Sequence, residues 1–234
     1  MLVGIMKGLV EFVASDALVS ATDVAIKGID KLSESAEKKA DKKLQKFLDA
    51  NPGHSHLFAT QIRYTFKEKY YIYDQNQAVK YTVKGELLSM KHHLHVYDAS
   101  GRSELGTVKE KLISLRSPLS LDSNPKDFDI EVEGKKIGKV KTKAAFTKQK
   151  FDVTFNGWRV EGDVFGKNYK ILDSDDNVIM FASQKLSYLN DMYFVDITNP
   201  QDEFYCVMIL LALDSASMTK GEETKRAIKK KRIL

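Results

Sequence analysis

The histidines of this sequence lie in two short clusters, and their imidazole nitrogens are its clearest potential metal ligands. The first cluster is His54-x-His56 and the second is His92-His93-x-His95. On a β-strand, His93 and His95 would point to one face and could supply two ligands. No cysteine lies nearby to supply a third, and the neighbouring acids are not at a recognised metal-binding spacing. The sequence therefore predicts no metal site, and no other cofactor.

Two other segments contain part of a ligand-binding motif. Residues 173–177 read Asp-x-Asp-x-Asn like the start of a calcium loop, but Val178 takes the glycine position and Gln184 the glutamate position. Gly162–Lys167 resembles a phosphate-binding loop with one residue too few between its glycines. The hydrolase patterns Gly-x-Ser-x-Gly and His-Glu-x-x-His are absent from the sequence. We therefore expect a hairpin turn at residues 173–177 and no enzymatic activity.

Five lysines in one short segment could bind the phosphates of anionic lipids. We call them the lysine band: Lys135, Lys136, Lys139, Lys141 and Lys143. In a strand the last three would share one face. The same pattern fits a solvated outer face or a sheet edge protected by lysine, and nearby Glu131 and Glu133 weaken the positive field.

The C-terminal segment 225–234, here called the basic tail, has six cations and a few apolar residues. The cations are Lys225, Arg226, Lys229, Lys230, Lys231 and Arg232. Each cation near an anionic leaflet contributes about 1 kcal/mol, so the tail could hold the protein at a membrane if an apolar segment helps. The alternatives are a solubilising end and a nonspecific nucleic-acid tail. We expect no specific nucleic-acid binding.

Composition indicates a soluble globular protein. The chain has 234 residues, of which 43% are hydrophobic, 10% aromatic and 29% charged. Its formal net charge of +5 comes entirely from residues 220–234, which contain seven Lys or Arg against two acids. The rest of the chain is balanced, which disfavours a DNA-wrapping surface. The single cysteine, Cys206, excludes an intrachain disulfide and is expected to be a small buried residue.

Residues 1–52 are predicted to form an N-terminal helical extension. Apolar residues in Leu2–Val13 recur at three-to-four spacing, Glu34–Leu48 has no β-branched residue, and Asn51-Pro52-Gly53 ends the pattern. The strip Leu2–Val13 would dock on the main domain, on a second copy or on a membrane surface. Residues 1–50 are therefore a candidate contact for a protein partner or for self-association. Lys7 and recurring acids argue against a secretory signal, so we expect a cytoplasmic protein.

Residues 53–217 are predicted to form the main domain, and from Leu57 to Thr198 the hydrophobic period is two. Strand-like runs are separated by turn residues every eight to twelve positions. Four turns fall between consecutive runs, which is typical of antiparallel hairpins. The turns are Asp74–Asn76, Asp98–Gly101, Glu133–Lys135 and Asp173–Asn177. A loose internal repeat, with Val96-Tyr97-Asp98 matching Ile171-Leu172-Asp173, suggests two similar halves of one sheet.

The main domain ends in a segment that is apolar on every side. Asn199 can cap a helix and Pro200 suits its first turn, so Pro200 to about Ser215 should be helical. The ten residues Phe204–Leu213 leave no solvent face, yet at about 15 Å they are too short to cross a bilayer. Protein must therefore surround this helix, and a sheet does so by closing into a barrel. A crevice between the sheet and the N-terminal helices is the alternative. The predicted core residues of the helix are Phe204, Tyr205, Val207, Met208, Ile209, Leu210, Leu211 and Leu213.

These features together resemble the LURP-one-related family. The features are a meander of about twelve strands, a Gly-Lys-Val-Lys-x-Lys strand at Gly138–Lys143 and an apolar closing helix ending in Ala212-Leu213-Asp214. The resemblance covers roughly Leu57–Ser217. It implies the fold of the tubby C-terminal domains and phospholipid scramblases, a mainly β closed antiparallel barrel threaded by a hydrophobic C-terminal helix. It also implies a non-enzymatic module, and tubby domains bind membrane phosphoinositides.

The sequence thus predicts a non-catalytic binding or tethering module. Its expected partner is anionic phospholipid at the inner face of a membrane, bound by the lysine band and the basic tail. The basic tail is part of a C-terminal region that follows the main domain and covers residues 218–234. The alternative is a protein-interaction or assembly module that uses residues 1–50.

Overall fold

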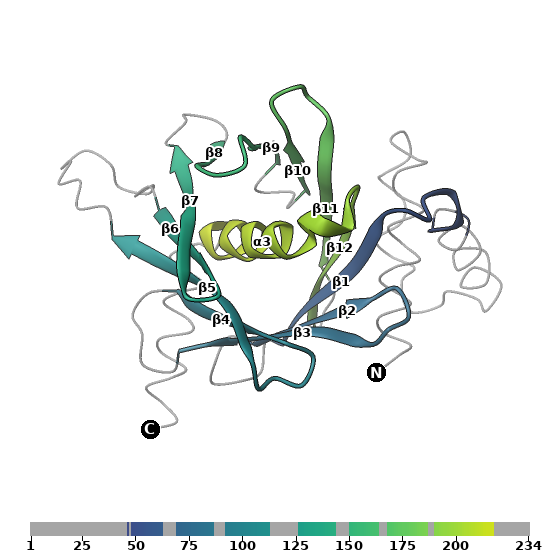
Figure 1. Cartoon of the computed structure of the whole chain (residues 1–234), viewed down its shortest axis with the longest axis horizontal. Helices are drawn as coiled ribbons and strands as arrows, with labels where there is room; N and C mark the ends of the chain where they lie inside the picture. The colour runs from purple at the N-terminus through teal and green to yellow at the C-terminus, as the bar shows by residue number, and fades with distance from the viewer. Residues whose placement is uncertain are drawn as a thin grey trace, which may run out of the picture.

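The computed structural model forms a closed antiparallel barrel around a helix. It describes residues 46, 48–62, 69–86, 92–112, 126–143, 150–163, 168–186 and 190–217. Strands β1 to β12 each pair with their neighbours in sequence, and β1 pairs with β12 to close the barrel (Figure 1). Most of the predicted N-terminal extension and all of the basic tail lie outside the described residues.

The strands follow one another around the barrel in sequence order. They are β1 Ser55–Ile62, β2 Lys69–Asp74, β3 Val79–Gly85, β4 His93–Tyr97, β5 Glu104–Leu112, β6 Lys126–Val132, β7 Lys135–Lys143, β8 Lys150–Val153, β9 Arg159–Asp163, β10 Asn168–Leu172, β11 Val178–Leu186 and β12 Asn190–Ile197. A 3₁₀ turn, η3 (Pro200–Asp202), leads into the helix α3 (Glu203–Ser217). The predicted fold class is therefore confirmed.

Period-two alternation decides which side chains fill the barrel. In β4, Leu94 and Val96 are fully buried and point inward, while His93 and His95, which alternate with them along the strand, face outward. The inward residues of the strands form one apolar cluster with α3. The outward set carries the polar and charged residues that could bind ligands.

Aspartates at the predicted turns stabilise three hairpins. Asp74, Asp98 and Asp173 each accept hydrogen bonds from backbone amides two to five residues further on. Asp74, Asp98 and Asp173 each follow a register shift near the end of their strands, so the three hairpins share one local geometry. The calcium-like segment is thus a hairpin turn, as predicted.

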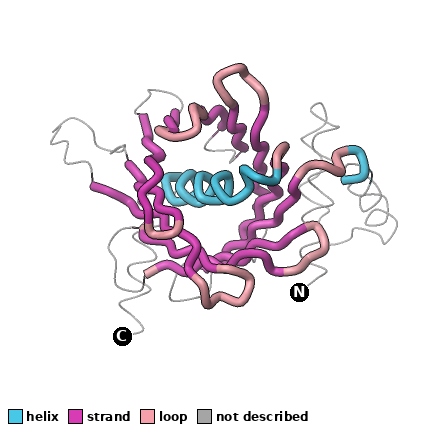
Figure 2. Tube along the Cα trace, viewed as in Figure 1, coloured by secondary structure: helices cyan, strands magenta, loops and turns pink. Residues whose placement is uncertain are grey.

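Helix α3 occupies the interior of the barrel (Figure 2). Asn199 accepts a hydrogen bond from the Gln201 amide at 3.1 Å, as expected of an N-cap. The α-helix starts at Glu203 and runs to Ser217, two residues beyond the expected end. Every residue of the apolar segment from Cys206 to Leu213 is at most 2% exposed. The closed barrel excludes the alternative of an open crevice.

Two of the predicted core residues are less buried than expected. Phe204 and Tyr205 are only partly buried, and they pack against Tyr81 and Phe155 with ring centroids 5.6 and 6.4 Å apart. Both lie in the first turn of α3, where their neighbours cover them only in part. The other six predicted core residues are buried, and so is Cys206, where burial raises the pKa of the thiol.

A buried carboxylate fixes the start of α3 to the barrel. Glu203 is 4% exposed and accepts hydrogen bonds from the Tyr81 hydroxyl and the Lys80 ammonium, each at 2.7 Å, and from the Ser55 hydroxyl. From the sequence alone, an acid at this position would be expected only to complement the positive end of the helix dipole. Burial, together with the neighbouring Glu203, raises the pKa of Tyr81, so its hydroxyl stays a donor.

Candidate functional site

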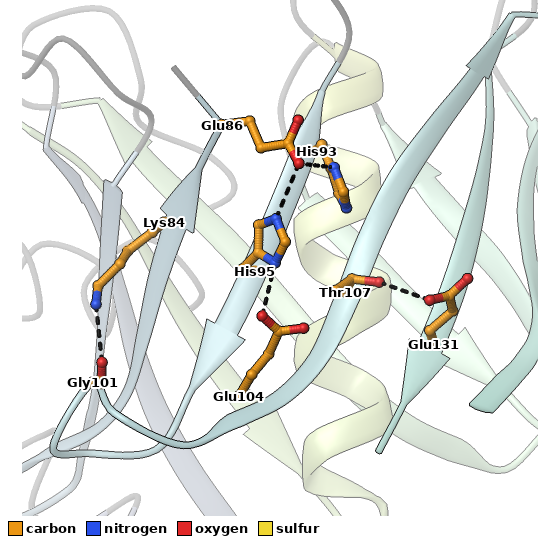
Figure 3. A network of polar contacts seen from close by, with 8 residues as sticks. All are labelled: Lys84, Glu86, His93, His95, Gly101, Glu104, Thr107 and Glu131. Atoms are coloured by element: carbon orange, nitrogen blue, oxygen red, sulfur yellow. Dashed lines mark hydrogen bonds and ion pairs between the residues drawn. The ribbon is translucent and has the colours of Figure 1, made fainter. Parts of the chain in front are cut away.

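A histidine–carboxylate cluster lies on the outer surface of the barrel, over β3, β4 and β5 (Figure 3). His93 and His95 project from the same face of β4 with ring centroids 4.4 Å apart. Glu86 directly follows β3, and its backbone amide donates to the His93 carbonyl. Its Oε1 atom lies 2.5 Å from His93 Nδ1 and 3.4 Å from His95 Nε2. We call Glu86, His93 and His95 the outer triad.

A second carboxylate holds the other side of the His95 ring. His95 Nδ1 lies 2.9 Å from Glu104 Oε2, so the imidazole sits between two acids (Figure 3). Burial and the neighbouring His95 lower the pKa of His93. Desolvation opposes ionisation of Glu86, but its contacts with His95 and His93 outweigh this and lower the pKa of its carboxyl.

Another histidine pair meets an acid across β1 and β12. Asp196 Oδ1 lies 2.9 Å from His54 Nδ1 and 3.2 Å from His56 Nε2. The side chain of His56 is only 1% exposed and stacks on Phe194. Burial would raise the pKa of Asp196, but the hydrogen bonds with His56 and His54 lower it. These three residues, His54, His56 and Asp196, tie the start of β1 to β12, the strand that closes the barrel. We call them the inner cluster because His56 is almost fully buried, although the residues do not line the barrel interior.

The lysine band lies on β7 and the turn before it, next to a column of acids on β6. Register pairs Asp129 with Lys139 and Asp127 with Lys141, so the opposite charges alternate across the surface. Lys135, Lys136 and Lys141 are exposed, whereas Lys139 is half-buried. The side chain of Lys143 and the basic tail lie outside what the structure describes.

One acid on β6 binds the ammonium groups of two lysines, one from the lysine band and one from β5. Asp129 Oδ2 lies 2.6 Å from Lys111 Nζ and 2.8 Å from Lys136 Nζ, and its side chain is 5% exposed. Burial opposes ionisation of Asp129, yet both lysines together lower the pKa of its carboxyl. Lys136, predicted as a lipid contact, is therefore partly neutralised within the fold.

Sequence reasoning found the histidines and lysines but missed their acidic partners. Glu86 is seven residues from His93, and Asp196 is 142 residues from His54. Only the cross-strand register brings these groups together. Glu86 directly follows the observed strand β3, and no motif in the sequence pointed to it.

Comparison with known proteins shows which family this chain belongs to. The sequence model described as LURP-one-related matches residues 55–214, which span the barrel from its first strand into α3. The chain belongs to the LURP-one-related family. The resemblance noted from the sequence is thereby confirmed.

Two known proteins similar to this LURP-one-related chain come from a bacterium and a plant. The uncharacterised protein YxjI of Bacillus subtilis (strain 168) is 29% identical over 168 residues, covering 72% of this chain and 97% of YxjI. An X-ray structure of a protein from Arabidopsis thaliana matches with a TM-score of 0.48 at 14% identity, covering 70% of this chain and 92% of that one.

The interior of this LURP-one-related barrel is occupied by α3, so the candidate ligand-binding groups lie on its outside. Among the described residues, no helix has the length and apolar character needed to span a bilayer. The groups that could meet a ligand are therefore the outer triad, the inner cluster and the lysine band.

Proposed function

We propose that this protein is a non-catalytic binding module that contacts anionic phospholipid headgroups at the inner face of a membrane. The lysine band and the basic tail would supply the attraction, and the strip Leu2–Val13 would add apolar burial. The observation that carries the proposal is the exposure of Lys136 and Lys141 on the outward side of β7, with Lys135 also exposed at the start of that strand.

The geometry of the band favours a broad charged surface over a shaped pocket. Lys109 and Lys111 on β5 extend the row of cations beyond β6, and both are exposed. Asp129 neutralises part of this charge but also holds Lys111 and Lys136 close together. A surface of this kind attracts clustered anionic headgroups, and its attraction weakens as salt rises.

Vesicle co-sedimentation tests this proposal. The full chain is mixed with phosphatidylcholine vesicles, with and without phosphatidylserine, at low and high sodium chloride. We expect pelleting only with phosphatidylserine at low salt. Replacing Lys135, Lys139 and Lys141 by Gln should weaken binding about a hundredfold, since each lysine contributes about 1 kcal/mol.

A charge-matched control separates location from net charge. Lys46, Arg102 and Lys170 are exposed elsewhere on the molecule, so their triple Gln variant loses the same charge but should bind normally. A third variant replaces the six cations of the basic tail by Gln. Equal recovery in the supernatant under all conditions, or equal losses in the band and control variants, would reject the lysine band as a lipid site.

A second candidate function is assembly through the first fifty residues. Phe58 and Phe194 point out of the barrel from β1 and β12, with ring centroids 5.4 Å apart, yet they are only 2% and 4% exposed. Met192 on the same face is also buried. Because these outward-facing residues are already buried within the chain, the assembly function depends on the apolar pattern of the strip Leu2–Val13 itself.

Deletion of residues 1–50 distinguishes the two functions. If these residues join copies or partners, light scattering should give a lower molar mass for the deleted chain while vesicle binding persists. If the deletion abolishes vesicle binding and the number of chains per particle stays the same, the assembly function is rejected.

A further inference from the structure

We propose that the outer triad binds a divalent first-row transition-metal ion, with Zn²⁺ as the expected ion. The ligands would be one carboxylate oxygen of Glu86, Nδ1 of His93 and Nε2 of His95. These three atoms lie within 4.8 Å of one another on the outer surface of the barrel (Figure 3). This site is separate from the lysine band and does not depend on lipid binding.

The spacing of the three atoms suits one small cation. Zinc bonds of about 2.0–2.1 Å in a tetrahedral site place neighbouring ligand atoms about 3.3 Å apart. Glu86 Oε1 and His95 Nε2 are already 3.4 Å apart. Glu86 Oε1 and His93 Nδ1 are 2.5 Å apart and need to separate by less than 1 Å. The side chain of Glu86 is 44% exposed and follows the end of β3, so it has room for this movement.

The contact with Glu104 prepares His95 to act as a ligand. When the Nδ1–H group of His95 donates to Glu104, the neutral ring has its lone pair on Nε2, facing Glu86. A cation between Nε2 and the Glu86 carboxylate would then bind both atoms, in place of the hydrogen-bond contact between them. A metal-bound histidine whose other nitrogen donates to a carboxylate is a common arrangement in proteins, and the outer carboxylate strengthens metal binding.

The fold holds both histidines in place before any ion arrives. His93 and His95 flank the fully buried Leu94 in β4, so the strand anchors the two rings on one face. In the sequence, the two histidines have no third ligand at a recognised spacing. In the structure, Glu86 can be that ligand, because the β3–β4 pairing brings it beside the histidines.

The surrounding charges partly offset one another. Glu86 and Glu104 supply two negative charges, while Lys109 lies opposite His93 on β5 and opposes a cation. Lys84 lies opposite His95, but its ammonium group donates to the Gly101 carbonyl and sits over the Tyr97 ring, away from the triad. The local balance therefore favours a dication.

The donor atoms select the class of metal. Two imidazole nitrogens and one carboxylate suit Zn²⁺, Ni²⁺ or Cu²⁺, whereas Mg²⁺ and Ca²⁺ prefer sites made of oxygen atoms. Three protein ligands leave a fourth position for water or for a group on another molecule. The inner cluster is a poorer candidate, because the His56 side chain is 1% exposed and lies against the Phe194 ring.

Zinc titration of the full chain tests the site. The protein, without an affinity tag and freed of metal by a chelator, is titrated with zinc chloride in a calorimeter. We expect one Zn²⁺ per chain, and binding weakened at least about tenfold in each of Glu86→Gln, His93→Gln and His95→Gln. Glu104→Gln should weaken binding about tenfold, as loss of an outer partner does in other zinc sites.

Matched controls assign the ion to its ligands. His54→Gln changes the inner cluster and Glu133→Gln an exposed turn, and both should bind like the wild type. Co²⁺ gives a second readout, since a four-coordinate site containing histidine shows strong visible absorption that the triad variants should lose. Circular dichroism melts confirm that each variant folds. A wild type that binds no Zn²⁺, triad variants with unchanged affinity, or loss of the ion only in His54→Gln would each overturn the proposal.

Discussion

The hydroxyl of Tyr193 donates a hydrogen bond to Asp214 Oδ1 at 2.6 Å, deep inside the barrel. Tyr70 donates to the other oxygen of the same carboxylate at 2.8 Å, and Gln61 donates in turn to Tyr70 at 2.9 Å. Asp214 is 2% exposed and lies near the end of α3. Together with Glu203 at its start, this carboxylate fixes the helix to strands on the barrel wall.

The bond between Tyr193 and Asp214 should contribute measurably to stability. Burial and the neighbouring carboxylate raise the pKa of Tyr193, so its hydroxyl remains a donor at physiological pH. We expect Tyr193→Phe to lower the free energy of unfolding by about 1.5–3 kcal/mol, as measured by urea denaturation. Tyr71→Phe on the outer face of β2 is the control and should stay within about 0.5 kcal/mol of the wild type. Equal stability of the two variants would contradict this role.

Close packing of β5 against the β6 backbone and α3 leaves no room for a side chain at Gly106. A Cβ atom there would lie 2.5 Å from the Glu131 carbonyl oxygen and 3.0 Å from the terminal methyl group of Met208. We expect Gly106→Ala to lower the melting temperature and to cost about 1–3 kcal/mol of stability. Gly53→Ala serves as the control, because no atom lies within 4 Å of the added methyl group. A Gly106→Ala protein as stable as the control would show that the β6 backbone and α3 can both move away from β5 at little cost.

The stability of the wild type should fall in acid partly through Asp129. Lys111 and Lys136 lower the pKa of this carboxyl in the folded state below its ordinary value of 3.8. The resulting stabilisation is complete well above pH 3.8 and is lost as the pH falls through the lower, folded-state pKa. Asp129→Asn should therefore be less stable than the wild type at pH 7, and the difference should shrink steadily below about pH 4.

Urea denaturation at a series of pH values measures this difference. Asp127→Asn is the matched control, since Asp127 lies on the same outward face of β6 but the ammonium groups of Lys111 and Lys136 bind Asp129 instead. A constant difference between Asp129→Asn and the wild type from pH 7 to pH 2 would mean that the ion pairs do not stabilise the fold.

Much of the architecture could be predicted because its signals are local. Period-two alternation determines which side of each strand is apolar, and an aspartate at a turn caps its own hairpin. The fully apolar segment of α3 required an enclosing wall, which the burial of Met208 and Leu211 bears out. The burial of Phe204 and Tyr205 was predicted less well. The apolar character of a residue does not tell how completely its neighbours will cover it.

The sequence by itself therefore determined the barrel, its turns and the helix inside it. Only the tertiary structure decided which charges meet: Glu86 with His93 and His95, and Asp129 with two lysines. The physical reason is register. Alternation assigns a side chain to a face, but its neighbours on that face depend on how adjacent strands slide past one another, and turns and bulges set that offset.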